Sequence, residues 1–248
     1  MPNPEIFLVA IGLVAGFVDA IAGGGGLIAL PAMSLLVGPG VEAIGTNKIA
    51  GVAVAGIAFA VYLRKGHVDW KSSILFTVCV GAGALLGGVT AQFIPVSVFP
   101  WLLAATCPLI LYLVWKRDLW TARALHPGDA SVVAVALSGL AAGFYDGVWG
   151  PGAGTLMFLG LLFFARLPLL TALAASKLAN TTSAIVGLTT YAVAGHVHVH
   201  EGSMLAIGML VGGFFGAHLA STNANRIVRP ALVLIVVLLA ARVISVYA

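Results

Sequence analysis

The chain contains the same hydrophobic pattern twice. Residues 12–25 read GLVAGFVDAIAGGG, and residues 139–152 read GLAAGFYDGVWGPG, so that Asp19 corresponds to Asp146, 127 positions later. After a gain of two residues the register continues, and Lys48 corresponds to Lys177, 129 positions later. A duplicated apolar chain with Gly/Pro interruptions at matching positions is typical of secondary transporters, whose halves each contribute to one central site.

The amino-acid composition indicates that this repeat folds in a lipid bilayer and not in water. Hydrophobic residues make up 61% of the 248, and charged residues only 8%. A soluble domain has about a quarter of its residues charged, so this chain cannot cover a water-exposed surface. The net charge of +4 is carried mainly by loops, which suits the control of membrane topology and not the binding of nucleic acid.

Hydropathy predicts the membrane-spanning segments. Since about 20 apolar residues cross the hydrocarbon, six runs read as full crossings: 46–63, 72–94, 97–115, 174–194, 203–222 and 229–247. Two further stretches, 5–37 and 130–164, are too long for one simple crossing and are interrupted at 23–26 and 150–152. Each could form two helices, one broken helix, or a re-entrant hairpin. The predicted organisation is a first membrane repeat at 1–116, a cytoplasmic linker at 117–129 and a second membrane repeat at 130–248.

Loop charges distinguish the topologies. If each interrupted stretch returns to the side it entered from, one face collects Arg64, Lys65, Lys71, Lys116, Arg117, Arg123, Arg166, Arg226 and Arg229. If each stretch crosses once, these residues scatter over both faces. The positive-inside rule favours the first arrangement. The predicted fold is therefore an all-α polytopic membrane protein of two inverted-topology repeats. Each repeat has one Gly/Pro-broken segment, re-entrant or discontinuous, plus three transmembrane helices, and both chain termini are periplasmic.

Four charges fall within or beside the apolar runs: Asp19, Lys48, Asp146 and Lys177. Charges inside a membrane are costly and mark a pathway, a coupling site or a mutual ion pair. Compact ammonium groups near half-helix N-termini attract an anion, which favours anion contact for the lysines. The aspartates are equally compatible with a structural ion pair, with capping of the broken backbone, or with coupling to a proton gradient.

Small polar residues and glycines complete the candidate site. Backbone freed at a helix break is tolerated only inside protein or around a wet cavity, and glycine lets a ligand approach that backbone closely. Serine and threonine hydroxyl groups near the lysines could bind an anion, or they could instead donate to carbonyl groups of their own helix. Glycines spaced as Gly83/Gly87 and Gly212/Gly216 are predicted to serve helix packing. The predicted substrate-binding residues are Gly23, Gly24, Gly25, Asn47, Lys48, Gly150, Gly152, Ser176, Lys177 and Asn180.

Other chemistries find little support in the residues. The alternating His196, His198 and His200 have only Glu201 to complete a metal shell, so no metal site and no cofactor are predicted. No nucleotide loop, H-E-x-x-H or intramembrane Ser/His pair is present, which argues against an enzyme. A scaffold subunit would not need buried charge in both halves.

The repeated G-x-x-A-G-F-x-D-x-x-x-G-x-G block, with Thr46-Asn47-Lys48 after the first break, resembles the TauE/SafE family of sulfite exporters. The resemblance covers nearly the whole chain. It implies a carrier of the bacterial inner membrane that exports sulfite, an organosulfonate or a related oxyanion. The second repeat departs from the pattern, because Pro151 replaces a glycine and Ala175-Ser176-Lys177 stands where Thr-Asn-Lys would be.

The leading hypothesis is thus a secondary transporter that moves a small anion by alternating access, with one repeat rocking against the other. The expected partners are that anion and the lipid bilayer, and a homo-oligomer is compatible with the sequence. The alternative is a cation- or proton-coupled carrier of another small solute, centred on Asp19 and Asp146.

Overall fold

In the computed structural model, residues 3–98, 101 and 131–247 are described, and all of their regular structure is helical. The first half holds α1 (Pro4–Ala22), α2 (Gly26–Val37), α3 (Val41–Arg64), α4 (Trp70–Ala91) and the short 3₁₀ helix η1 (Val96–Val98). The second half holds α7 (Val132–Val148), α8 (Ala153–Phe163), α9 (Leu169–Val193) and α10 (Val199–Tyr247). The predicted linker 117–129 and nearly all of the predicted crossing 97–115 lie outside the described residues.

Five helices among the described residues are long and apolar enough to cross a membrane. They span Pro4–Ala22, Val41–Arg64, Ser73–Ala91, Leu169–Val193 and Val199–Ala224. The prediction of a polytopic, all-helical membrane protein is confirmed. The last predicted crossing is the far part of α10, which follows a kink at Asn223 where φ is −132° and ψ is 36°.

Helices α3 and α9 begin about five residues earlier than hydropathy predicts. Gly40 precedes α3 with a φ of 87°, a conformation suited to glycine, and the helix starts directly after it. Pro168 precedes α9 with a φ of −55°. As a result Lys48 and Lys177 lie inside their helices, about two turns from the start, and not at the beginning of a crossing as the sequence suggested.

Both interruptions occur where the glycines predicted them. Helix α1 ends at Gly23, which is left-handed (φ 81°) and whose N–H donates to the Asp19 carbonyl at 2.7 Å. Helix α7 ends before Gly150 (φ 97°), and α8 follows Gly152 (φ 80°). A positive φ departs from the helical path, and glycine adopts it without the strain that a side chain would bring.

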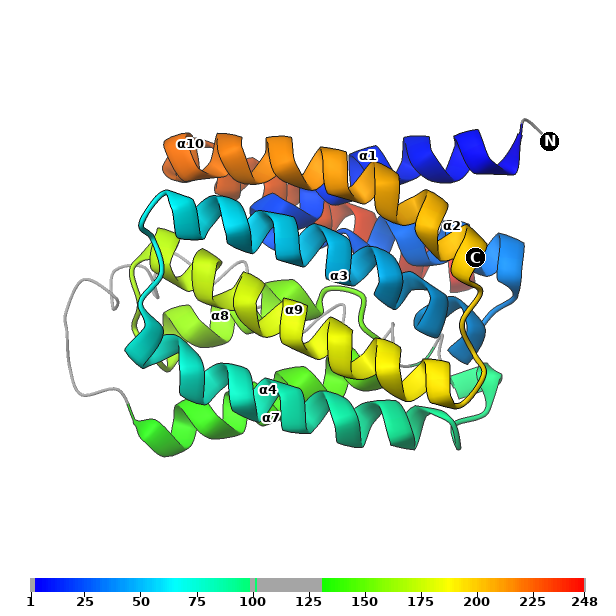
Figure 1. Ribbon diagram of the computed structural model, residues 1–248, viewed down its shortest axis with the longest axis horizontal. Coiled ribbons are helices and arrows are strands. Elements are labelled where there is room, and N and C mark those ends of the chain that lie inside the picture. Colours follow the sequence, from blue (N-terminus) through cyan, green and yellow to red (C-terminus); the bar gives the residue numbers. More distant parts are fainter. Residues whose placement is uncertain (1–2, 99–100, 102–130, 248) are drawn as a thin grey trace.

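The helices of one half pack against helices of the other half (Figure 1). Helix α1 packs along α10, α4 packs along α7, and α3 and α9 lie side by side between these two pairs. In the view of Figure 1, α1 and α3 run from right to left, whereas α7 and α9 run from left to right. Helix α2 returns toward the edge where α1 began, and α8 likewise returns toward the start of α7.

Glycines form the seams between the halves, as predicted for Gly83/Gly87 and Gly212/Gly216. A Cβ atom at Gly87 would lie 2.9 Å from the Val148 nitrogen, and one at Gly212 would lie 2.8 Å from the Phe17 nitrogen. Real Cβ atoms essentially never approach backbone this closely. Only glycine therefore allows α4 to contact α7 and α10 to contact α1 at backbone distance.

Candidate functional site

The two helix breaks meet each other in the interior. A Cβ atom on Gly154 would lie 2.9 Å from the Gly23 Cα, and one on Gly26 would lie 3.5 Å from the Pro151 Cα. The Thr155 hydroxyl donates to the Ala22 carbonyl at 2.7 Å, which satisfies an acceptor left open where α1 ends. The backbone freed at each break is thus enclosed by protein, as a membrane interior requires.

The four intramembrane charges form two ion pairs, each joining one repeat to the other. Lys48 Nζ lies 2.8 Å from Asp146 Oδ2, and Lys177 Nζ lies 2.9 Å from Asp19 Oδ2. Each ammonium group also donates to the main-chain carbonyl of its aspartate. All four residues are at most 5% exposed. The charges thus form mutual ion pairs, and each lysine pairs with the aspartate of the other repeat, which the sequence did not specify.

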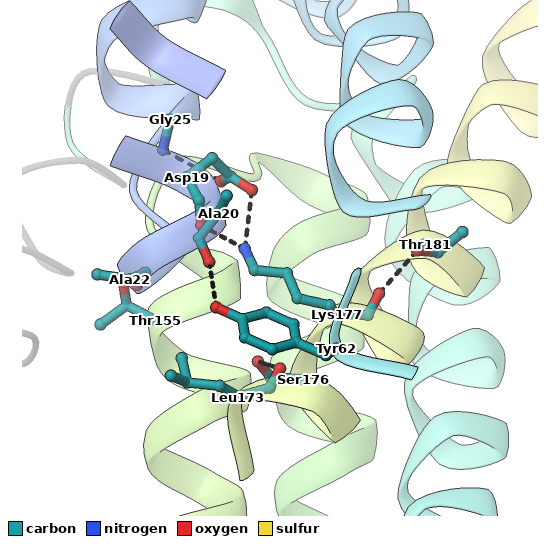
Figure 2. Close-up of polar contacts among 10 residues, drawn as sticks. All are labelled: Asp19, Ala20, Ala22, Gly25, Tyr62, Thr155, Leu173, Ser176, Lys177 and Thr181. Carbon is teal, nitrogen blue, oxygen red and sulfur yellow. Dashed lines mark hydrogen bonds and ion pairs between the residues drawn. The ribbon is translucent and has the colours of Figure 1, made fainter. Parts of the chain in front are cut away.

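Further polar groups hold the two aspartates in place. The Gly25 backbone N–H donates to Asp19 Oδ1 at 3.1 Å, and the Ser183 hydroxyl donates to Asp146 Oδ2. Figure 2 shows Asp19 between the ammonium group of Lys177 and the Gly25 nitrogen. A buried carboxylate with several donors is far better stabilised than one with a single partner.

Two corresponding tyrosines brace the helix ends beside the aspartates. The Tyr62 hydroxyl donates to the Ala20 carbonyl at 3.1 Å (Figure 2), and the Tyr191 hydroxyl donates to the Gly147 carbonyl at 2.7 Å. Both rings are fully buried. Each tyrosine fixes the residue directly after an aspartate, so it sets the position of the carboxylate. Tyr62 and Tyr191 occupy corresponding positions of the two repeats, 129 residues apart.

A small cavity of about 40 Å³ lies among these groups, with room for about three water molecules. Seven of the residues predicted as substrate-binding or coupling groups line it: Asp19, Gly23, Asn47, Lys48, Asp146, Gly150 and Asn180. Its wall also contains Gly26, Ile44, Gly51, Val54, Trp149, Gly154, Ala184 and Met209, which the sequence did not single out.

Asn47 and Asn180 both line the cavity. The Asn47 Oδ1 atom is buried and has no hydrogen-bond partner among the residues that the structure describes. A buried amide oxygen without a partner is destabilising, so a group that enters the cavity and offers a hydrogen to it is favoured. Asn47 corresponds to Ser176 and Asn180 to Gly51, so each repeat supplies one amide from a different helical turn.

The other predicted site residues lie outside this wall. Gly24, Gly25, Gly152, Ser176 and Lys177 are not among the described residues that line the cavity. The Ser176 hydroxyl donates to the Leu173 carbonyl at 2.8 Å, and the Thr181 hydroxyl donates to the Lys177 carbonyl at 2.7 Å (Figure 2). These hydroxyls follow the alternative of bonding to their own helix.

The histidines form a separate polar cluster at the start of α3. His196 Nδ1 lies 2.8 Å from Glu42 Oε1, His198 Nε2 lies 3.1 Å from Glu42 Oε2, and His200 Nε2 lies 3.1 Å from Glu5 Oε1. Within residues 3–98, 101 and 131–247, no group of three or more His, Cys, Asp or Glu side chains has the geometry to hold a metal ion. The cluster joins the α9–α10 connection to α3 and α1.

Comparison with known proteins identifies the family. The family model for the sulfite exporter TauE/SafE matches residues 8–243. A "probable membrane transporter protein ORF9" from a Sinorhizobium species is 33% identical, over 96% of this chain and 92% of that protein. A "probable membrane transporter protein" from Haemophilus influenzae is 30% identical, over 96% of this chain and 93% of its own length.

A more distant relative from Bacillus subtilis, named "probable membrane transporter protein YunE", is 25% identical over 93% of this chain and 92% of its own length. No solved structure matches the chain. With an all-helical, membrane-spanning fold and a family match over almost its whole length, the chain is a multi-pass membrane protein that belongs to the sulfite exporter TauE/SafE family.

Proposed function

We propose that the protein is a secondary transporter that exports a small anion, namely sulfite, an organosulfonate or a related oxyanion, by alternating access. The observation that carries the proposal is the cavity between the two broken helices, which Lys48, Asn47 and Asn180 line. Relatives over the full length are named as membrane transporters, and the family is named for sulfite export.

The chemistry of the cavity suits an oxyanion. Lys48 offers a positive charge, and the amide nitrogens of Asn47 and Asn180 offer N–H donors for oxygen atoms. The Asn47 Oδ1, which has no partner among the described residues, can accept from a hydroxyl group that the anion carries. Backbone glycines at both breaks, Gly23 and Gly150, let a ligand lie against the main chain. A volume of about 40 Å³ matches an anion of a few heavy atoms.

The helix directions support an inverted-repeat arrangement. Corresponding helices of the two halves run in opposite directions in Figure 1, and each broken pair returns to the edge where it began. Three basic residues outside the interior lie at the edge where α7 begins and α3 ends: Arg64 ends α3, Lys71 begins α4 and Arg166 precedes α9. The acidic and histidine cluster around Glu42 lies at the other ends of α3 and α9.

This arrangement predicts that both termini face the periplasm. An alkaline phosphatase fused after the C-terminus should be active in cells, because that enzyme needs an oxidising compartment, whereas a fluorescent protein that matures only in the cytoplasm should stay dark. A fusion within the linker at 117–129 serves as the matched control and should give the opposite result. A C-terminal reporter found in the cytoplasm would contradict the inverted topology.

The binding site is tested by sulfite flux into liposomes that contain the purified protein, at a pH near 8, where sulfite does not leak as sulfur dioxide. Asn47→Ala should raise the KM about ten- to hundredfold, since it removes a hydrogen bond to a charged ligand. Lys48→Ala/Lys177→Ala should abolish flux. Lys65→Ala, which removes an exposed lysine, should leave flux unchanged. Wild-type flux in the double variant would refute the site assignment.

A second candidate follows from the two carboxylates in the cavity wall. Asp19 and Asp146 both line it, and carboxylate oxygens suit a cation. In a cation- or proton-coupled carrier of another small solute the lysines would act as counter-charges. Solute flux that depends on Na⁺ and persists without any anionic substrate would favour this function over anion export.

A further inference from the structure

The two ion pairs are equivalent in sequence but differ in their relation to the cavity. Lys48 lines the cavity together with Asp146, whereas Lys177 is not among the described residues of its wall. The side chain of Lys48 is 6% exposed and that of Lys177 is 1% exposed. An anion that enters the cavity therefore meets Lys48 directly and meets Lys177 only after a rearrangement.

The two aspartates also differ in their second partner. Ser183 donates its hydroxyl to Asp146 Oδ2, the same oxygen that Lys48 contacts at 2.8 Å. The residue that corresponds to Ser183 in the first repeat is Val54, so Asp19 has the Gly25 backbone N–H instead. A hydroxyl group both donates and accepts. Ser183 can therefore remain bonded to Asp146 whether that side chain is a carboxylate or a carboxylic acid.

Charge balance limits what can enter this space. The charges of Lys48, Lys177, Asp19 and Asp146 cancel, and all four groups are buried. If Lys48 turns from Asp146 to a substrate anion, Asp146 becomes a buried carboxylate without a cation. Such a carboxylate is strongly disfavoured, and protonation is the ordinary response of a carboxylate that has lost its counter-charge to a low-dielectric site.

We propose that Lys48 moves from Asp146 to the anion while Asp146 takes up a proton, so that anion and proton leave together, driven outward by the concentration gradient of the anion and not by the proton gradient. The Lys177–Asp19 pair stays closed as a structural contact. This inference rests on the proposed anion transport and names its coupling ion. An O–H bond forms on Asp146 with a proton from the side of entry. That bond breaks on the other side, when the anion leaves and Lys48 returns.

The surroundings of Asp146 leave this carboxylate as the group that changes charge. Lys48 from α3 and Ser183 from α9 contact it directly, and Asp19 from α1 lies in the same cavity wall but is held by Lys177. Tyr191 from α9 faces the same helix end, and its hydroxyl already donates to the Gly147 carbonyl. For a monovalent anion the combined movement is electroneutral.

The test uses isethionate, a sulfonate that stays ionised near neutral pH, so that any proton moved is not the substrate's own. Liposomes that hold the protein and a trapped pH-sensitive dye are given an inward gradient of labelled isethionate. In the wild type the interior should acidify, with one proton for each anion. In Asp146→Asn the anion should still enter, while the proton-to-anion ratio falls to near zero. In Asp19→Asn/Lys177→Met flux should slow, but the ratio should stay.

Ser183→Ala tests the same carboxylate with the ion pair intact and one hydroxyl removed. Because Lys48 and Asp146 are both kept, the proton-to-anion ratio should stay at one, while flux changes with the loss of the hydroxyl bonded to Asp146 Oδ2. Isethionate flux without acidification in the wild type would overturn the proposal, as would loss of the ratio in Asp19→Asn/Lys177→Met with retention in Asp146→Asn. Absence of both sulfite and isethionate flux would overturn the proposed function itself.

Discussion

Lys177→Met should destabilise the protein by about 3–5 kcal/mol, because it leaves Asp19 as a buried carboxylate without a cation. The ammonium group lies 2.9 Å from Asp19 Oδ2 and also donates to the Asp19 carbonyl. Methionine nearly preserves the length and the apolar stem of the side chain, so the lost charge dominates the effect. The measurement is the temperature at which the detergent-purified protein loses its monodisperse elution peak.

The matched control is Lys177→Met/Asp19→Asn. With both charges removed, the amide oxygen introduced at position 19 can still accept from the Gly25 N–H, and most of the lost stability should return. A double variant as unstable as Lys177→Met would show that the defect comes from packing of the side chain. A single variant as stable as the wild type would show that Asp19 finds another partner.

Gly212→Ala should cost about 3 kcal/mol or more, although it adds a single methyl group in a helix. Its Cβ would lie within 2.8 Å of the Leu13 carbonyl carbon and of the Phe17 nitrogen. Backbone atoms cannot rotate away as a side chain can, so α1 and α10 must separate along their length. Separation moves α1, which carries Asp19, and both thermal stability and flux should fall.

Gly56→Ala is the control for helix propensity in the same fold. The nearest atom to its added Cβ is a Thr181 methyl carbon at 4.0 Å, and alanine is favoured over glycine inside a helix by up to about 1 kcal/mol. This variant should therefore be neutral or slightly more stable. Equal losses in Gly56→Ala and Gly212→Ala would refute the view that the α1–α10 seam has a special need for glycine.

The sequence predicts the helix breaks and the buried charges because their signals are local. Glycines at 23–26 and 150–152 break helices wherever they occur in an apolar run, and the structure breaks there. A charged side chain in an apolar run needs an opposite charge or a polar partner. This requirement singles out Asp19, Lys48, Asp146 and Lys177. The spacing of two glycines four residues apart is enough to predict that Gly87 and Gly212 serve helix packing.

What sequence could not supply is the choice of partners across the fold. Nothing along the chain indicates that Lys48 pairs with Asp146 and not with Asp19, which is closer in sequence. Nothing in the sequence distinguishes Ser183 from the other hydroxyl side chains of its helix, and only the structure shows its hydrogen bond to Asp146 Oδ2. Hydropathy predicts the start of α3 about five residues late, because Glu42 and the turn at Gly40 lower the hydropathy of a stretch that is nevertheless helical.

The close glycine contacts between the two halves also determine which parts of the molecule can move as units. Each glycine seam fastens the fourth helix of one half to the first helix of the other, so a motion of residues 1–116 against 130–248 would separate both seams. The closely packed groups of helices therefore mix the two halves. Helices α1–α3 pack with α10, and α4 packs with α7–α9; the groups meet where α3 contacts α9 and where the two helix breaks contact each other. Both ion pairs then join one of these groups of helices to the other. An anion that draws Lys48 away from Asp146 breaks one of these two connections, while the Lys177–Asp19 ion pair keeps the other.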